Sequence, residues 1–87
     1  MKSIDKKKIG FIWTNTRGDV EGNIEHIARH ELIPQDVECA FRNAITIESR
    51  SKSSNLPMAI GPTPGGEMIR IIYTQIDDNW IRVITAY

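Results

Sequence analysis

Cysteine is almost absent from this sequence of 87 residues: Cys39 stands alone, which excludes an internal disulfide framework. An excess of charge of one sign is also missing, because eleven Lys and Arg residues balance eleven Asp and Glu residues. A globally basic nucleic-acid binder is therefore not indicated, and any phosphate site needs its cations gathered on one face. The apolar runs are too short to cross a bilayer, and no secretory signal pattern precedes them. These absences predict a cytoplasmic protein with a single domain and no membrane partner.

Two short helices are predicted after a first strand at 9–14, where β-forming residues are bounded by charge and by a turn. Between 21 and 30 the apolar residues recur at helical spacing, and Asp19 or Asn23 can cap the start of this helix. Pro34 suits the first turn of a second helix. The apolar stripe of that second helix consists of Val37, Ala40 and Phe41.

Four further strands are predicted after the helices, because β-branched and aromatic runs alternate with turn-forming residues. The runs cover 44–50, 56–61, 67–76 and 79–87. The chain is thus predicted to be an α+β fold of order β-α-α-β-β-β-β, with two short helices packed on one face of a mostly antiparallel sheet. The other face should stay open to solvent or to a partner. Residues 1–8, which include "KKK", are expected to form a flexible basic tail.

Arginine side chains are expected on the open face of this sheet. Arg70 and Arg82 each lie between two apolar neighbours in their strands. In the strand predicted at 44–50, Ile45 and Ile47 share one side, and the polar residues, including Arg50, share the other. The predicted polar side of the sheet consists of Arg50, Arg70 and Arg82 with Thr46, Glu48 and Trp80. The competing interpretation is three solvated arginines paired with nearby carboxylates.

Two other patterns resemble a metal site and a phosphate-binding loop, but each lacks residues that such a site needs. His26 and His30 would project from one side of the first helix, a spacing that can present two zinc ligands. The hydrolytic version of that motif has Glu directly after the first His, where this chain has Ile27, and no third ligand is evident. We therefore predict no metal site. The stretch "TPGGE" at 63–67 lacks the Lys of a phosphate-binding loop and joins two strands, so we expect a hairpin turn.

A resemblance spans the chain from about Phe11 to Ala86. It is carried by Trp13, "IARHELIPQDVECAF" at 27–41, "ESR" at 48–50, "AIGPTPGG" at 59–66, "IIYT" at 71–74 and "RVITA" at 82–86. In this order and spacing the segments resemble the BrnT family, which are ribonuclease toxins of type II toxin–antitoxin systems. The resemblance implies a single BrnT-like domain with a RelE-like fold. It also implies a metal-independent endoribonuclease that inhibits translation, needs no cofactor and is neutralised by a DNA-binding, BrnA-like antitoxin.

The resemblance also implies roles for individual residues. Without a metal, the 2′-hydroxyl of the RNA attacks the adjacent phosphorus, so the protein must move protons and stabilise charge on phosphate oxygens. Arginine matches phosphate oxygens, histidine exchanges protons near neutral pH, and aromatic rings stack on bases. The expected catalytic residues are Arg50, Arg82 and His30, and the expected RNA-binding residues are Trp13, Arg70, Tyr73 and Tyr87.

Five positions depart from the usual pattern of the family. Thr14, Glu31, Pro62, Glu67 and Tyr87 stand where the family usually carries Asp, Gly, Arg, a basic residue and Arg. A phosphate site with fewer cations binds RNA less tightly. The departures therefore motivate a second hypothesis, in which the chain is a catalytically reduced, toxin-like module that keeps only a protein-binding surface.

Overall fold

The helices and strands follow one another in the predicted order. The computed structural model describes residues 4–51 and 55–87, apart from the side chains of Glu48 and Ser49. The elements within this part of the chain are β1 (Gly10–Ile12), α1 (Asn23–Ala28), α2 (Pro34–Arg42), β2 (Thr46–Arg50), β3 (Pro57–Pro62), β4 (Met68–Gln75) and β5 (Trp80–Ala86). The predicted β-α-α-β-β-β-β order is confirmed.

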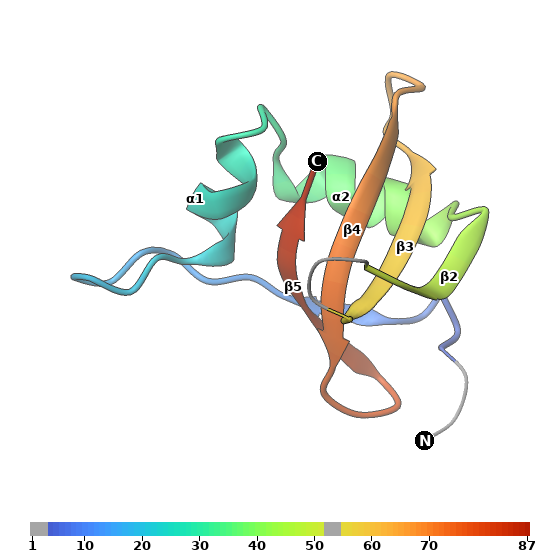
Figure 1. Cartoon of the computed structure of the whole chain (residues 1–87), viewed down its shortest axis with the longest axis horizontal. Coiled ribbons are helices and arrows are strands. Elements are labelled where there is room, and N and C mark those ends of the chain that lie inside the picture. Colours follow the sequence, from blue (N-terminus) through green and yellow to red (C-terminus); the bar gives the residue numbers. More distant parts are fainter. Residues whose placement is uncertain (1–3, 52–54) are drawn as a thin grey trace.

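The five strands form one mixed sheet with the order β1-β5-β4-β3-β2 (Figure 1). Strands β2 to β5 make an antiparallel meander joined by hairpins. Strand β1 lies beside β5 and runs parallel to it, with Gly10 opposite Trp80 and Ile12 opposite Arg82. The first and the last of the described strands are therefore neighbours.

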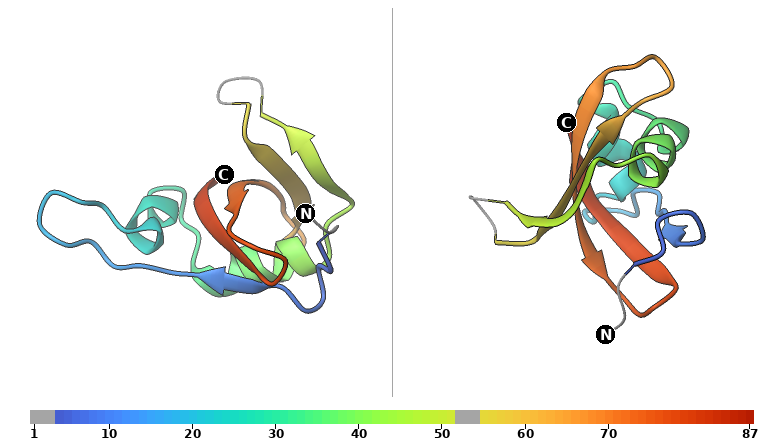
Figure 2. Two further views of the ribbon diagram at one scale, coloured as in Figure 1. Left: turned by 90° about the horizontal axis from the view of Figure 1, so that it is seen from below. Right: turned by 90° about the vertical axis from the view of Figure 1, so that its right-hand side faces the viewer.

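Both helices lie on the same side of the sheet, as the right-hand view of Figure 2 shows. Helix α2 packs across β3 and β4, and α1 lies against β5. The predicted stripe of α2, Val37, Ala40 and Phe41, is fully buried. These side chains share a core with the inward-facing residues of the sheet, which are Ala59, Ile69, Ile71, Tyr73, Ile81, Val83 and Ala86. The fold is thus α+β, with a mixed five-stranded sheet and two helices.

Gly61 determines how closely α2 approaches β3. A Cβ atom at this position would lie 1.9 Å from the carbonyl oxygen of Ala40 in α2, which no real contact allows. Only glycine lets the helix rest directly on the strand at this point.

The described part of the N-terminal segment is attached to the body of the protein. The Arg42 guanidinium donates hydrogen bonds to the carbonyl oxygens of Lys7 at 2.9 Å and Ile9 at 3.1 Å, and the Lys6 ammonium donates to the Ala44 carbonyl at 2.8 Å. Ile9 is buried, and Ile4 packs against the core. The flexible tail expected at 1–8 is therefore corrected for residues 4–8; residues 1–3 lie outside the described part.

Helix α1 is shorter than the predicted range of 21–30. Its N-cap is Gly22, rather than Asp19 or Asn23, and its last residue is Ala28. Glu31 then takes a left-handed backbone conformation with φ of 62°, which turns the chain toward α2. His30 lies in this turn, so His26 and His30 do not share one helix side.

The segment between β3 and β4 is the predicted hairpin turn. The Thr63 amide donates to the Glu67 carbonyl at 2.8 Å, and Gly66 has a positive φ of 89°. Glycine is the residue that adopts this conformation without strain.

Candidate functional site

Arg70 and Arg82 are exposed on the face of the sheet that the helices leave open. Arg82 lies opposite Ile12 on one side and Thr74 on the other, and it alternates with the buried residues of β5. Thr74 and Arg70 are four residues apart along β4, about 13 Å at the usual rise of a strand. The two arginines thus share a face, and their backbone positions are about four strand residues apart along it.

Arg50 departs from this arrangement. It lies opposite Pro57, which is on the same side of β3 as Ala59 and Gly61, beneath α2. An irregularity between Thr46 and Ser49 adds a residue to β2 and reverses the alternation beyond it. The prediction that all three arginines share the open face is therefore wrong for Arg50.

Tyr73 is a core residue. Its exposed fraction is 0%, and its ring meets the ring of Phe41 edge-on at 5.2 Å. It belongs to the same side of β4 as Ile69 and Ile71. The predicted contact between Tyr73 and RNA is corrected, because no base can reach this ring in the folded protein.

His30, Arg70 and Tyr87 gather at one end of the open face. The His30 and Tyr87 rings lie 6.0 Å apart, and both residues are exposed. The backbone of Tyr87 exchanges two hydrogen bonds with Arg70, of 2.8 and 3.0 Å. Tyr87 lies five positions beyond Arg82 along the chain, about 16 Å at the usual rise of a strand. His30 is thus remote from the part of β5 that carries Arg82.

Trp13 is half-buried and serves to connect elements. Its indole nitrogen donates a hydrogen bond of 2.8 Å to the Glu38 carboxylate of α2. Its ring lies 6.4 Å from that of Phe11 in a stacked orientation. Part of Trp13 nevertheless lines a hollow next to β5.

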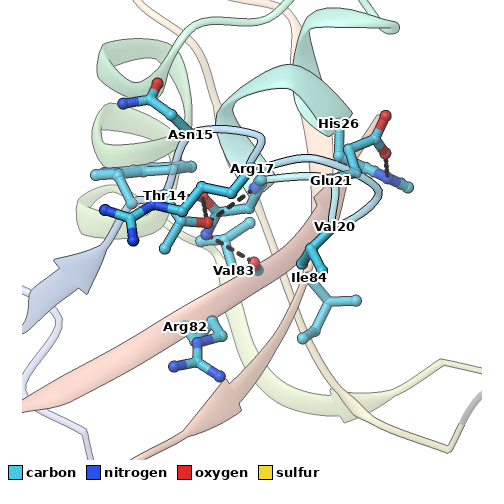
Figure 3. Close-up of a pocket in the computed structure, with 12 residues that line it drawn as sticks. Thr14, Asn15, Arg17, Val20, Glu21, His26, Arg82, Val83 and Ile84 are labelled. Carbon is cyan, nitrogen blue, oxygen red and sulfur yellow. Dashed lines mark hydrogen bonds and ion pairs between the residues drawn. The ribbon is translucent and has the colours of Figure 1, made fainter.

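This hollow is open to solvent and has a volume of about 830 Å³ (Figure 3). It lies between β5, α1 and the loop that joins β1 to α1, which projects from the body in Figure 1. Its lining residues are Trp13, Thr14, Asn15, Arg17, Val20, Glu21, Gly22, Asn23, His26, Arg82, Val83 and Ile84. Of the residues predicted for the site, Arg82 and Trp13 are here, and Arg50, Arg70, Tyr73, Tyr87 and His30 are not.

Asn23 holds the loop over β5. Its side-chain amide nitrogen donates to the carbonyl oxygens of Ile12 at 2.8 Å and Val83 at 3.0 Å. Its side-chain oxygen accepts a hydrogen bond of 2.8 Å from the Thr14 amide. The tip of the loop is closed by paired backbone hydrogen bonds between Arg17 and Val20, of 2.8 and 2.9 Å. A buried amide with all these partners fixes one wall of the hollow relative to the sheet.

Positive charge in the hollow comes from two arginines that carry no neutralising partner within the described residues. The ion pairs formed there, between His26 and Glu21 and between Arg29 and Glu21, include neither Arg17 nor Arg82. Arg17 and Arg82 lie on one side of the hollow in Figure 3, with the Glu21 and His26 pair on the other side. This contradicts, for Arg82, the interpretation of a strand arginine paired with a carboxylate.

Glu21 orients the imidazole of His26. A carboxylate oxygen of Glu21 lies 2.8 Å from Nδ1 of His26, and the same carboxylate is bonded by Arg29. With Nδ1 engaged by a carboxylate, Nε2 is the ring atom that can exchange a proton with a ligand. The hollow thus combines an oriented acid–base group with two cations.

The sequence interpretation missed Arg17 and Asn15, named Thr14 only as a departure from the family pattern, and considered His26 only as a metal ligand. All of them reach the hollow because the loop folds back over β5. The turn signal in "NTRGD" predicts a loop, but nothing in it indicates which strand the loop covers. In residues 4–51 and 55–87, no three His, Cys, Asp or Glu side chains gather in a way that would hold a metal ion.

Comparison with known proteins identified no similar protein. Neither a family model, nor a curated protein, nor a solved structure matches this chain. Within the described residues, none of the helices has the length and apolar character needed to span a membrane.

Proposed function

We propose that this protein is a BrnT-like toxin: a cytoplasmic endoribonuclease with a RelE-like fold that cleaves RNA in the hollow beside β5 and thereby inhibits translation. The observation that supports the proposal best is the meeting of Arg17, Arg82 and the Glu21–His26 pair in one open hollow. Cations without carboxylate partners bind phosphate, and an oriented imidazole can accept a proton.

The proposed reaction needs no metal ion and no cofactor. The 2′-hydroxyl oxygen of the substrate bonds to the adjacent phosphorus, and the bond from phosphorus to the 5′-oxygen breaks. Nε2 of His26 takes the proton of the 2′-hydroxyl, and the departing 5′-oxygen takes up a proton from water. Arg82 and Arg17 stabilise the charge that develops on the phosphate oxygens. The products are a 2′,3′-cyclic phosphate and a 5′-hydroxyl.

Cleavage of a labelled single-stranded RNA in EDTA tests this assignment. We expect Arg82→Ala to lower the rate by about 10²- to 10³-fold, as for other groups that stabilise a developing anion. Arg50→Ala is the matched control, because Arg50 is exposed on the other side of the sheet and should leave the rate unchanged. The same RNA with 2′-O-methyl groups should not be cleaved by the parent protein. Absence of cleavage by the parent, or an equal rate for Arg82→Ala, contradicts the proposal.

The two histidines provide a second matched pair. His26→Gln should lose activity, whereas His30→Gln should retain it, because only His26 lines the hollow. The opposite result would support the role predicted for His30 from the sequence, and it would move the reaction to the end of the sheet that holds Tyr87. A substitution by Gln keeps a polar side chain of similar length, so it tests proton exchange rather than packing.

A BrnA-like, DNA-binding antitoxin is the proposed protein partner. Induced expression of the chain should arrest growth, and the product of an adjacent gene should relieve the arrest and copurify with the chain. The Arg82→Ala variant should be less toxic and should still bind the antitoxin if the antitoxin contacts other surfaces.

A second candidate function is a protein-binding module without catalysis. Val20 and Ile84, which line the hollow, are exposed by 73% and 40%, so the hollow offers apolar contact area as well as charge. The hairpin that carries Pro62 and Glu67 also supplies no cation. Under this function the chain would bind a partner protein, leave RNA intact and not affect growth when expressed.

A further inference from the structure

Trp80 is an exposed aromatic residue held in place by a glycine. It lies at the start of β5, opposite Gly10 of β1, and 47% of it is exposed. A Cβ atom at Gly10 would lie 2.6 Å from two carbons of the six-membered indole ring, so this ring occupies the space above the glycine. An aromatic ring packed over a cross-strand glycine is a stable arrangement in sheets. The indole is thus supported from below and open to solvent.

Trp80 and Arg82 point to the same face of β5. They are two residues apart, both are exposed, and they alternate with the buried residues Ile81 and Val83. This spacing is about 6.6 Å along the strand. Within the described residues the Arg82 guanidinium forms no ion pair. A supported ring beside such a cation is the combination with which proteins bind single-stranded nucleic acid: the ring stacks on a base, and the cation contacts the backbone.

Ile76 extends the apolar surface next to Trp80. Its amide donates a hydrogen bond of 2.9 Å to the Trp80 carbonyl, which places the two residues opposite each other, and Ile76 is 45% exposed. An apolar neighbour at this position adds contact area for a base and no group that competes for hydrogen bonds.

Acidic residues limit the direction in which a nucleic acid can continue. Asp77 and Asp78 lie in the turn between β4 and β5, and Asn79 separates them from Trp80. The Asp77 carboxylate at this end repels phosphates, whereas Arg82 and Arg17 attract them at the other end. A bound strand therefore has its backbone on the side of Arg82 and a base over Trp80, near the end of the contact.

We propose that Trp80 stacks on an unpaired base of a single-stranded RNA whose phosphate is held by Arg82. This inference rests on the proposed function, because it takes RNA as the ligand of Arg82. Trp80 replaces Tyr73, which is buried, and Trp13, which is bonded to Glu38, as the stacking residue. A base in a duplex is not available for stacking, so the site selects single strands.

Equilibrium binding of a fluorescent, single-stranded 2′-O-methyl RNA separates stacking from charge. Trp80→Leu should weaken binding about tenfold, within the range measured for loss of one base–aromatic contact, and Trp80→Phe should restore most of the affinity. Arg82→Ala should instead reduce the salt dependence of binding by about one phosphate contact. Circular dichroism should show that each variant folds as the parent does.

An RNA that lacks one base tests the same contact without changing the protein. The parent should bind best when the missing base is away from Trp80, so moving the abasic position along the RNA should reveal one position at which affinity falls about tenfold. Trp80→Leu should be insensitive to that position.

The outcomes distinguish the inference from the proposed function. If Arg82→Ala weakens binding and Trp80→Leu does not, the stacking role is overturned while RNA binding stands. If Trp80→Leu weakens duplex and single strand equally, the selection of single strands is overturned. If the parent binds none of these RNAs, the proposed function fails and the inference fails with it.

Discussion

The side-chain amide of Asn23 donates a hydrogen bond of 3.0 Å to the carbonyl oxygen of Val83, 60 residues further along the chain. Asn23 is the first residue of α1, and Val83 lies in the middle of β5. The same amide nitrogen bonds the Ile12 carbonyl at the end of β1. One buried side chain thus fixes the start of a helix, the end of an edge strand and the centre of its neighbour.

Removing this amide should destabilise the whole domain. Asn23→Ala leaves the carbonyl oxygens of Ile12 and Val83 without their donor, and we expect the free energy of unfolding to fall by about 2 to 4 kcal/mol. Denaturant unfolding followed by fluorescence measures the change. Asn15→Ala, at an exposed position of the same loop, should change stability by less than about 0.5 kcal/mol. Equal effects of the two substitutions would contradict the structural role of Asn23.

The contact between Gly61 and α2 predicts that adding one methyl group at position 61 strongly lowers the stability of the fold. In Gly61→Ala the new Cβ would overlap the Ala40 carbonyl oxygen, so α2 must move away from β3. We expect a loss of about 2 kcal/mol or more, the cost of overpacking a core contact. Gly65→Ala is the matched control, because its nearest heavy atom is 3.8 Å away. A melting temperature lowered by the first substitution and unchanged by the second would bear out the prediction.

Replacing Glu31 with glycine, the residue that the BrnT resemblance favours at this position, should stabilise the folded protein. Glu31 has φ of 62°, which costs a residue with a Cβ atom more than it costs glycine. We expect Glu31→Gly to raise the free energy of unfolding by up to about 1 kcal/mol. Glu31→Ala keeps the Cβ atom and should give no gain, so thermal unfolding of the two variants separates backbone strain from loss of charge. A gain in both would assign the effect to the charge.

Glu25 should make stability depend on pH in the acidic range. The amide of Thr16 donates to the Glu25 carboxylate, and this hydrogen bond holds the pKa of Glu25 below its ordinary value. Because the pKa is lower in the folded state, the unfolded state binds more protons in this range, and stability rises with pH. The contribution is complete above the unfolded pKa of about 4.3 and is lost as pH falls through the folded pKa.

Unfolding curves at several pH values between 3 and 6 measure this contribution. The curve of Glu25→Gln should lack the part of the slope that Glu25 supplies, so the difference in stability between parent and variant should shrink as pH falls. A constant difference across this range would show that the carboxylate charge has no role in binding the Thr16 amide.

Alternation of side chains predicted most of the sheet, since each strand between two turns has one buried side. The same alternation also indicates the side of the sheet on which Tyr73 and Trp80 lie, and the site prediction did not use this. Tyr73 lies two residues from Ile71 and belongs to the buried side, and Trp80 lies two residues from Arg82 and belongs to the exposed side. The pattern of β4 alone excluded Tyr73 from the open face.

The position of Arg50 could not be predicted in this way. The extra residue in β2 reverses the side on which every later residue lies, and no residue type in the strand marks the irregularity. The hollow could not be predicted from the sequence either, because it depends on the course of a loop. That course is set by the hydrogen bond from Asn23 to a residue 60 positions away. Local sequence describes local structure, whereas this site is made by contacts between distant segments.

The parallel pairing of β1 with β5 joins Gly10 to Trp80, which are 70 positions apart. On the ribosome, the first strand therefore leaves the exit tunnel long before the strand that it must pair with has been made. Until Trp80 to Arg82 emerge, β1 has no neighbour in the sheet, and the side of β5 that carries Arg82 does not exist. A chain that stopped before Trp80 would thus contain both helices and β2, β3 and β4, and it would lack the strand that pairs with β1 and carries Arg82.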